Sequence, residues 1–344
     1  MNPINDNMIE SNPETSASGV RSGATSRLHR TTSEPLRPGQ IAMANDSRFN
    51  ETFLSEPLTA YALGWGENET LLADLDFAAP QVLVPRRFEY RKALNSEEFA
   101  NEKEDIRAIG AEFRRVEPVG EIGLGKTLNK GLTLRIDLDQ AEALPNWRQM
   151  AVARLLRRLL RAELNRAINL LYSSSVSETV SWQGASGEDP DADLLRVIQK
   201  SANQSGIHPN RILFGDSAWA ARSLSHRAQS TAGGFASATL SPESLAPLLG
   251  MEGIHVCRGR YQSSGNNKSG FAENLILLYT AQTNQSPEDP SNIKRFVTPC
   301  PDGNLFRVYE QQITGKITDI TVEHYSDIVI TSSPGICSLV IKSV

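Results

Sequence analysis

Residues 120–127 read GEIGLGKT and match the phosphate-binding loop pattern G-x-x-x-x-G-K-[ST]. Such a loop binds phosphate where a buried strand leads into it and a helix follows, so that the helix N-terminus faces the anion. Here Pro118 and charged residues precede the motif, whereas Gly131 follows it and leads into a strand-like segment. Because both flanks lack the required context, we predict a flexible glycine-rich connection in which Lys126 binds no nucleotide. A P-loop nucleotide-binding protein is the alternative from another functional class.

Residues 214–217 read FGDS and resemble the first sequence block of GDS-type esterases, in which Ser217 would be the nucleophile. A nucleophilic serine needs an activating histidine and oxyanion donors. His324 and Asp327 could supply the activation only by coincidence of the fold, and the separate glycine and asparagine blocks of those esterases are missing. A simpler interpretation is that the glycine ends a strand while the aspartate or the serine caps the next helix. We therefore predict no catalytic residues and no enzyme activity.

Histidine and cysteine, which are frequent metal ligands, do not cluster along the chain. The five histidines are His29, His208, His226, His255 and His324, and the three cysteines are Cys257, Cys300 and Cys337. No histidine pair has metal-ligand spacing with carboxylates, and three widely spaced cysteines argue against a disulfide framework. We predict buried thiols and neither a metal nor a cofactor.

The composition limits the class of protein. The 344-residue chain carries a net charge of −5, and 39% of its residues are hydrophobic. Dedicated nucleic-acid readers are usually basic, so this charge fits a subunit whose partners are mainly copies of itself. No run approaches the roughly 18 consecutive apolar residues of a membrane-spanning helix. The first residues have neither a basic flank nor an apolar stretch, so we predict no signal peptide and expect synthesis in a cytoplasm.

Residues 86–116 contain many charges of both signs and few apolar residues, so this segment cannot form a core of its own. We predict either a solvated excursion or an extended hairpin that packs on an adjacent subunit through its charges. In the second case assembly should weaken as salt increases, because exposed charge pairs are screened. The proposed interface residues are Arg86, Arg87, Lys92, Glu97, Glu98, Glu102, Lys103 and Glu104.

A long amphipathic helix is predicted from Asn146 to about Ser173, with Asn146 as N-cap and Gln149 completing a capping box. Apolar residues recur every three or four positions on one face, among them Leu156 and Leu160. Four arginines follow the same spacing on another face, where a solvated surface is the simplest interpretation and a functional basic stripe the alternative. These arginines are Arg154, Arg157, Arg158 and Arg161.

The remaining pieces mix helices and strands. Residues 1–48 are polar and poor in aliphatic side chains, so they are predicted to be disordered or an extended arm. Residues 132–138 alternate apolar and polar side chains like a half-buried strand. Asp189 is placed to cap a helix that ends at Gly206, and residues 305–344 are nearly all strand. Further strands are predicted at 212–214, 254–257 and 275–279, and further helices at 217–224 and 241–250.

From about Leu58 to the C-terminus, the order of these pieces resembles major capsid proteins of tailed phages, of the Hong Kong-97 type. Residues 80–90 (PQVLVPRRFEY) are similar to the start of that family's extended loop, and residues 131–138 (GLTLRIDL) to the strand that leaves it. The predicted long helix, ending in RAELN at 161–165, is similar to the spine helix. Residues 209–219 (PNRILFGDSAW) resemble a strand-to-helix passage of the axial domain.

The resemblance implies an α+β phage major capsid fold with an N-terminal arm, an extended loop, a long spine helix in a peripheral domain and an axial α/β domain. The implied boundaries are a flexible N-terminal arm at 1–50, the arm and the start of the peripheral domain at 51–80, the extended loop at 81–130, the peripheral domain with the spine helix at 131–185, the axial domain at 186–300 and returning strands of the peripheral domain at 301–344.

The resemblance also implies a structural function. A chain of this family self-assembles through pentamers and hexamers into the icosahedral head of a tailed bacteriophage or prophage and encloses double-stranded DNA. The implied partners are other copies, a scaffold protein, a portal, other head proteins and DNA bound without sequence specificity, and no membrane. The implied location is the virion capsid, assembled in the host bacterial cytoplasm. The four arginines would then contact DNA or a neighbouring subunit. An encapsulin-like nanocompartment shell, which shares the fold but encloses enzymes, is the alternative.

Overall fold

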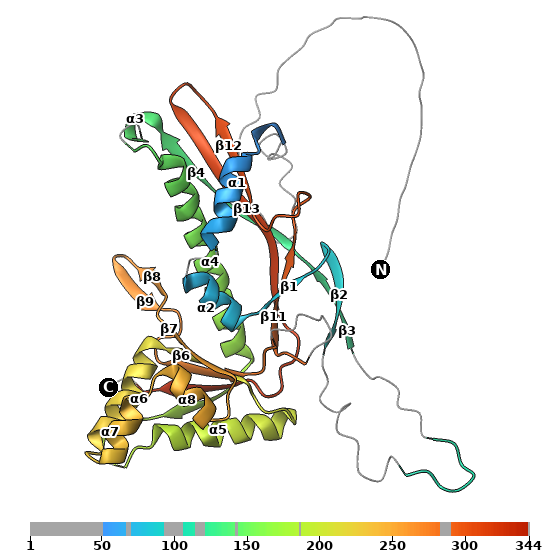
Figure 1. Cartoon of the computed structure of the whole chain (residues 1–344), viewed down its shortest axis with the longest axis vertical. Coiled ribbons are helices and arrows are strands. Elements are labelled where there is room, and N and C mark those ends of the chain that lie inside the picture. The colour runs from blue at the N-terminus through green and yellow to red at the C-terminus, as the bar shows by residue number, and fades with distance from the viewer. Residues whose placement is uncertain are drawn as a thin grey trace, which may run out of the picture. The chain divides into compact units, whose positions relative to one another are not determined.

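The computed structural model describes residues 51–66, 70–92, 106–113, 121–141, 144–185, 187–282 and 290–342. These residues belong to one structural unit, Asp46–Val344, and the predicted arm at 1–50 lies outside them. Two five-stranded sheets with helices packed on them make up most of the described part, which confirms the predicted α+β class (Figure 1). None of the described helices is long and apolar enough to cross a membrane.

The first sheet is built around the long strand β13. Its strands are β1 (Gln81–Leu83), β4 (Leu128–Asp137), β11 (Ile293–Thr298), β12 (Arg307–Gln312) and β13 (Ile317–Ile330). Strand β4 follows one edge of β13, while β12 and then β11 share the opposite edge, and β1 extends the sheet beyond β11. The predicted alternation of β4 is confirmed, since half-buried and exposed side chains alternate along it.

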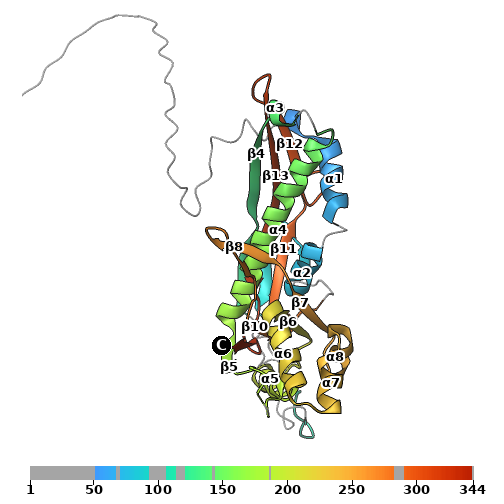
Figure 2. The same ribbon diagram turned by 90° about the vertical axis from the view of Figure 1, so that its left-hand side faces the viewer.

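Helix α4 (Trp147–Ser174) lies along one face of this sheet, as Figure 2 shows. Packed beside it are α1 (Glu56–Gly66) and α2 (Thr70–Ala78), with η2 (Glu51–Phe53) before them and α3 (Leu138–Ala141) after β4. The predicted leucine face is confirmed, because Leu156, Leu160 and Leu164 are almost fully buried. Leu156 packs with residues of the first sheet, whereas Leu160 and Leu164 belong to a cluster that reaches the second sheet.

The start of α4 agrees with the prediction, but its capping does not. The Asn146 backbone carbonyl accepts the first helical hydrogen bond, from the Met150 amide at 3.0 Å. Its side chain caps no backbone amide. The reason is its backbone conformation (φ −109°, ψ 27°), which is not the extended one that directs an N-cap side chain toward the helix. The predicted capping box is therefore wrong.

The second sheet has the strand order β5-β14-β10-β6-β7. Its strands are β5 (Val176–Val180), β6 (Arg211–Gly215), β7 (Gly253–Cys257), β10 (Leu275–Tyr279) and β14 (Cys337–Ile341). Around it lie α5 (Pro190–Ser205), α6 (Asp216–Ala228), α7 (Ala232–Ala238) and α8 (Pro242–Leu248). The central strands are continuous apolar runs because both faces are covered, and they form a second core.

The predicted signals of α5 are confirmed. Asp189 accepts a hydrogen bond from the Ala192 amide at 3.1 Å, and Gly206 ends the helix in the left-handed conformation with φ 70°. The hairpin predicted at 86–116 is formed by β2 (Arg87–Lys92) and β3 (Glu121–Lys126), so its second strand lies beyond the predicted range. Helix α7 and a second hairpin, which pairs β8 (Arg260–Ser264) with β9 (Asn267–Gly270), were not predicted.

The implied domain boundaries differ from the sheets that the structure shows. Strand β11, assigned to the axial domain at 186–300, pairs with β13 in the first sheet. Strands β5 and β14, assigned to the peripheral domain at 131–185 and 301–344, pair with each other in the second sheet. Residues 337–341 can lie there because their apolar side chains fill the core between β5 and β10.

Candidate assembly surfaces

Residues 121–126 of the phosphate-binding pattern form strand β3 of a hairpin, and a strand rather than a helix follows them. Strand β3 pairs antiparallel with β2, and β4 comes directly after it. Gly123 lies opposite Tyr90 and Gly125 opposite Phe88, and each ring covers its glycine so closely that a Cβ atom would collide with it. The predicted flexible connection is therefore wrong. Close packing of aromatic rings, and not phosphate binding, explains these glycines.

The same rings attach the base of the β2–β3 hairpin to the first sheet. Phe88 and Tyr90 pack against Phe296 of β11, with ring centroids 4.3 and 5.6 Å apart. Directly after β3, the buried hydroxyls of Thr127 and Thr298 are hydrogen-bonded at 2.7 Å. The hairpin base is thus fixed to the sheet by apolar and polar contacts together.

The esterase-like motif has the predicted strand-to-helix setting, but its proposed partners lie elsewhere. Residues 214–217 pass from β6 into α6 in the second sheet. His324 and Asp327 lie on β13 in the first sheet. The Asp216 carboxylate pairs with Arg260 at 3.0 Å. Because the serine and the histidine belong to different sheets, the motif is a helix start and not a nucleophile with its base.

The cysteines are buried and unpaired, as predicted. Burial raises the pKa of the Cys257 thiol to about 12 and that of Cys300 to about 11, so neither is a thiolate at neutral pH. In the described ranges, no group of three or more His, Cys, Asp or Glu side chains could hold a metal ion.

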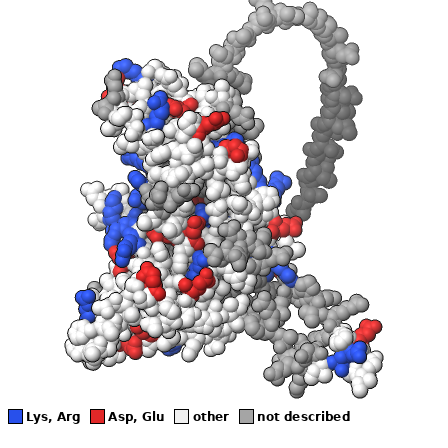
Figure 3. Space-filling model, viewed as in Figure 1, with Lys and Arg blue, Asp and Glu red and all other residues white. Residues whose placement is uncertain are grey.

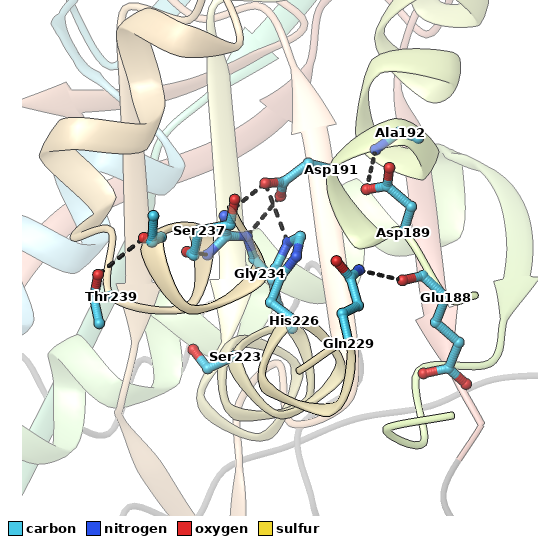
Figure 4. A network of polar contacts seen from close by, with 12 residues as sticks. Glu188, Asp189, Asp191, Ala192, Ser223, His226, Gln229, Gly234, Ser237 and Thr239 are labelled. Carbon is cyan, nitrogen blue, oxygen red and sulfur yellow. Dashed lines mark hydrogen bonds and ion pairs between the residues drawn. The ribbon is translucent and has the colours of Figure 1, made fainter. Parts of the chain in front are cut away.

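A buried polar network joins the helices around the second sheet (Figure 4). The Asp191 carboxylate accepts two hydrogen bonds from Arg222, whose side chain is fully buried, at 2.7 and 2.8 Å. Arg222 also donates to the Ser237 carbonyl of α7 at 3.3 Å. His226 Nε2 lies 3.2 Å from the same aspartate, whereas the Ser223 hydroxyl donates to a carbonyl of its own helix. The network therefore holds α5, α6 and α7 together. It does not hydrogen-bond the Ser223 hydroxyl to His226.

A second buried cluster joins α4 to the first sheet at Glu163. The Glu163 carboxylate accepts hydrogen bonds from Lys130 Nζ at 2.8 Å and Ser326 Oγ at 3.0 Å, and it pairs with Arg166 one turn along the helix. Burial alone would raise the pKa of Glu163, but the adjacent Lys130 charge lowers it. His324 Nε2 lies 4.0 Å from this carboxylate, and burial lowers the pKa of His324 to about 4.

Three of the proposed interface residues, Arg86, Arg87 and Lys92, lie on or directly before strand β2 of the hairpin. The Arg86 guanidinium lies over the Tyr325 ring of the same chain, 4.0 Å from its centroid. Lys92 Nζ lies 2.8 Å from a Glu121 carboxylate oxygen across the hairpin, and Arg87 is exposed. Two of the three therefore have partners within the chain, which the sequence did not indicate. Glu97, Glu98, Glu102, Lys103 and Glu104 lie outside the described residues.

The hairpin strands and residues 106–113, which lie between them in sequence, expose apolar side chains that the many charged neighbours did not suggest. They are Ile106, Ile109, Phe113, Ile122 and Leu124, and Leu124 is 81% exposed. A sequence signal was present for Ile122 and Leu124, because they alternate with Gly123 and Gly125 and so occupy the opposite face of β3. This surface offers hydrophobic contact as well as charge.

The four arginines of α4, Arg154, Arg157, Arg158 and Arg161, are all exposed, on the side away from the leucine face. The Arg157 guanidinium lies 5.5 Å from the centroid of the Trp65 ring. Figure 3 shows Lys and Arg side chains gathered on the side of the molecule where α4 and the β8–β9 hairpin lie. The structure thus confirms the separation of leucine and arginine faces, whereas the partner of the arginines stays a prediction.

No protein-family model matches the sequence, and no curated protein matches it either. Solved structures do match. A phage-related protein from Bordetella bronchiseptica RB50 is 15% identical, with a TM-score of 0.61 over 83% of this chain and 96% of that one. A chain in the capsid structure of cyanophage P-SCSP1u is 8% identical, with a TM-score of 0.50 over 78% and 88%. The predicted phage capsid fold is confirmed by these similarities.

Proposed function

We propose that this protein is the major capsid protein of a tailed bacteriophage or prophage. It is a structural subunit without enzyme activity that assembles through pentamers and hexamers into an icosahedral head around double-stranded DNA. The observation that carries the proposal is the fold match to a phage-related protein over 83% of the chain at a TM-score of 0.61. A scaffold protein, a portal and other head proteins are further proposed partners. The proposed location is the virion capsid, assembled in the host bacterial cytoplasm.

The exposed apolar surface of residues 106–113 and β3 supports assembly. Burying a large aliphatic or aromatic side chain stabilises a contact by about 1.5–3 kcal/mol. Ile122 and Leu124 point away from the aromatic contacts of the hairpin base, and Leu124 is 81% exposed. A protein that functioned alone would gain nothing from this exposure, whereas a shell subunit covers it with a neighbour.

Expression of the full chain in a bacterial cytoplasm, followed by electron microscopy and light scattering, tests the proposal. We expect closed shells, or pentamers and hexamers. The variant Ile122→Asp with Leu124→Asp should keep the fold but assemble poorly, because it places charges where a neighbour would pack. Leu144→Asp, at another exposed apolar position, is the control. A parent chain that stays monomeric at every salt and crowding condition would refute the proposal.

The contents of the particles separate a phage head from an encapsulin-like compartment. A head assembled with its portal and packaging proteins should protect double-stranded DNA from nuclease. A compartment should instead retain a protein cargo when it is expressed with its neighbouring genes. Shells that enclose protein and exclude DNA under both conditions would support the alternative.

A further inference from the structure

We propose that helix α4 and the β8–β9 hairpin form one phosphate-binding surface, which holds the backbone of packaged double-stranded DNA without reading its sequence. The surface consists of Arg154, Arg157, Arg158 and Arg161 of α4, together with Arg258, Arg260 and Lys268 at the hairpin. The inference rests on the proposed function, because it assigns the DNA contact of the shell to particular residues.

The α4 part of this surface contains no exposed carboxylate. The helix carries six arginines and one acidic residue, Glu163, and that carboxylate is buried against the first sheet. Within the described part of the chain, Arg154, Arg158 and Arg161 pair with no carboxylate. Like charges on adjacent helical turns repel one another, so the arrangement of Arg154, Arg158 and Arg161 is mildly destabilising until an anion joins it. A merely solvated helix face would gain from mixed charges.

The hairpin continues the basic surface beside α4. Cys257 and Phe271, which flank the hairpin in sequence, belong to the same buried cluster as Leu164 of α4. Leu164 is three residues from Arg161 and therefore on the neighbouring turn. Arg258 and Arg260 are 75% and 54% exposed and share the single carboxylate of Asp216. The exposed Lys268 of β9 adds a further charge. Figure 3 shows basic side chains gathered on this side.

Duplex DNA offers this surface a higher density of negative charge than an acidic protein segment does. From Arg154 to Arg161 the helix rises about 10 Å. Duplex DNA carries one negative charge per about 1.7 Å of its axis, so several phosphates lie within that span. The competing occupant is the acid-rich segment 97–105 of a second copy, which has five acidic residues and one lysine. Even consecutive carboxylates on an extended chain are about 3.3 Å apart.

The test uses full-length, unassembled subunits and a short duplex DNA of mixed sequence, with fluorescence anisotropy measured over a range of salt. Replacing the four α4 arginines by Gln should weaken binding about tenfold or more, and should reduce the slope of log affinity against log salt by about 3–4. Replacing them by Lys should keep most of that slope. The control changes Arg196, Arg227, Lys316 and Lys342 to Gln, which removes the same charge from other exposed positions.

Several outcomes would overturn the inference. A parent subunit that does not bind DNA, or a control that loses as much affinity as the α4 variant, would show that this surface is not a DNA contact. A poly-glutamate peptide that binds more tightly than DNA would favour the acidic segment of a second copy. If the Gln variant misfolds by circular dichroism, the pair Arg158→Gln and Arg161→Gln replaces it, with an expected loss of slope of about 2.

Shell formation is scored separately, so the two proposals can fail independently. If the parent chain forms no shell, the proposed function fails whatever the DNA result. If the parent forms shells and the α4 variant binds and retains DNA equally well, only this inference fails. Normal shells that retain DNA poorly are the expected result for the variant. Poor shells with unchanged DNA binding would make the surface a subunit contact and would overturn the inference.

Discussion

Acidification should destabilise the folded subunit through His324. This side chain is only 5% exposed, and its Nδ1 atom has no hydrogen-bond partner among the described residues. Burial lowers its pKa from 6.5 to about 4, and the nearby Lys130 and Arg166 charges act in the same direction, while Glu163 opposes them. The His324 side chain is therefore harder to protonate in the folded state than in the unfolded chain.

The sign and size of the stability change follow from this difference in pKa. As pH falls below 6.5 the unfolded chain is protonated at His324 first, so stability is lost between pH 6.5 and about 4. Each pKa unit corresponds to about 1.4 kcal/mol, which gives a loss of about 2 kcal/mol at pH 5 and about 3 kcal/mol below pH 4. The lowered pKa of Glu163 makes stability fall with acid as well, at lower pH.

Urea unfolding of the unassembled subunit at constant ionic strength, from pH 7.5 to pH 4.5, measures the effect. The parent should lose about 2 kcal/mol more than His324→Gln between pH 7 and pH 5, because Gln does not titrate. His208→Gln, at an exposed histidine, is the control and should follow the parent. The comparison uses the change in unfolding free energy with pH, so a pH-independent destabilisation by the substitution does not affect it. Parallel curves for the parent and His324→Gln would refute the reasoning.

Three further predictions concern packing and assembly. Leu156→Ala should lower the free energy of unfolding by about 2–5 kcal/mol, because it opens a cavity between α4 and the first sheet; an unchanged urea midpoint would mean that the site collapses without cost. Gly125→Val should displace the Phe88 ring and raise the protease sensitivity of the hairpin, whereas equal sensitivity would show that the ring is not needed there. Arg86→Glu with Arg87→Glu should leave the subunit folded, at a cost of about 0.5–1 kcal/mol for the lost ring contact, but should hinder assembly measured by light scattering. Assembly equal to the parent at every salt concentration would remove both arginines from the interface.

Local patterns predicted the elements that depend on local physics. Helix α4 was predicted to within a residue at each end, because 28 residues repeat an apolar face that only a helix can bury on one side. Helix α5 was predicted from Asp189 and Gly206, each of which acts on backbone groups close to it in sequence. By contrast, α7 has the sequence AGGFASA, whose two glycines disfavour a helix, and it is stabilised by contacts with α6.

Contacts between residues that lie far apart in the chain could not be predicted from the sequence. The placement of β14 between β5 and β10 depends on pairing with strands far away in the chain, and nothing within residues 337–341 specifies those partners. The stacking of Arg86 on Tyr325 joins positions far apart in the chain, so Arg86 looked like a free surface charge. The four α4 arginines could be placed on one face, but their connection to the β8–β9 hairpin depends on the packing of Cys257 and Phe271 with Leu164.

The glycines beneath the rings of Phe88 and Tyr90 also constrain how this sequence can change over time. A side chain at position 123 or 125 is tolerated only if the opposing ring becomes small, and loss of the ring removes the need for glycine. Related sequences should therefore gain or lose each glycine and aromatic pair together. Conversely, a glycine of a nucleotide-binding signature can persist by inheritance in a lineage that never met a nucleotide, because the ring of Phe88 selects Gly125.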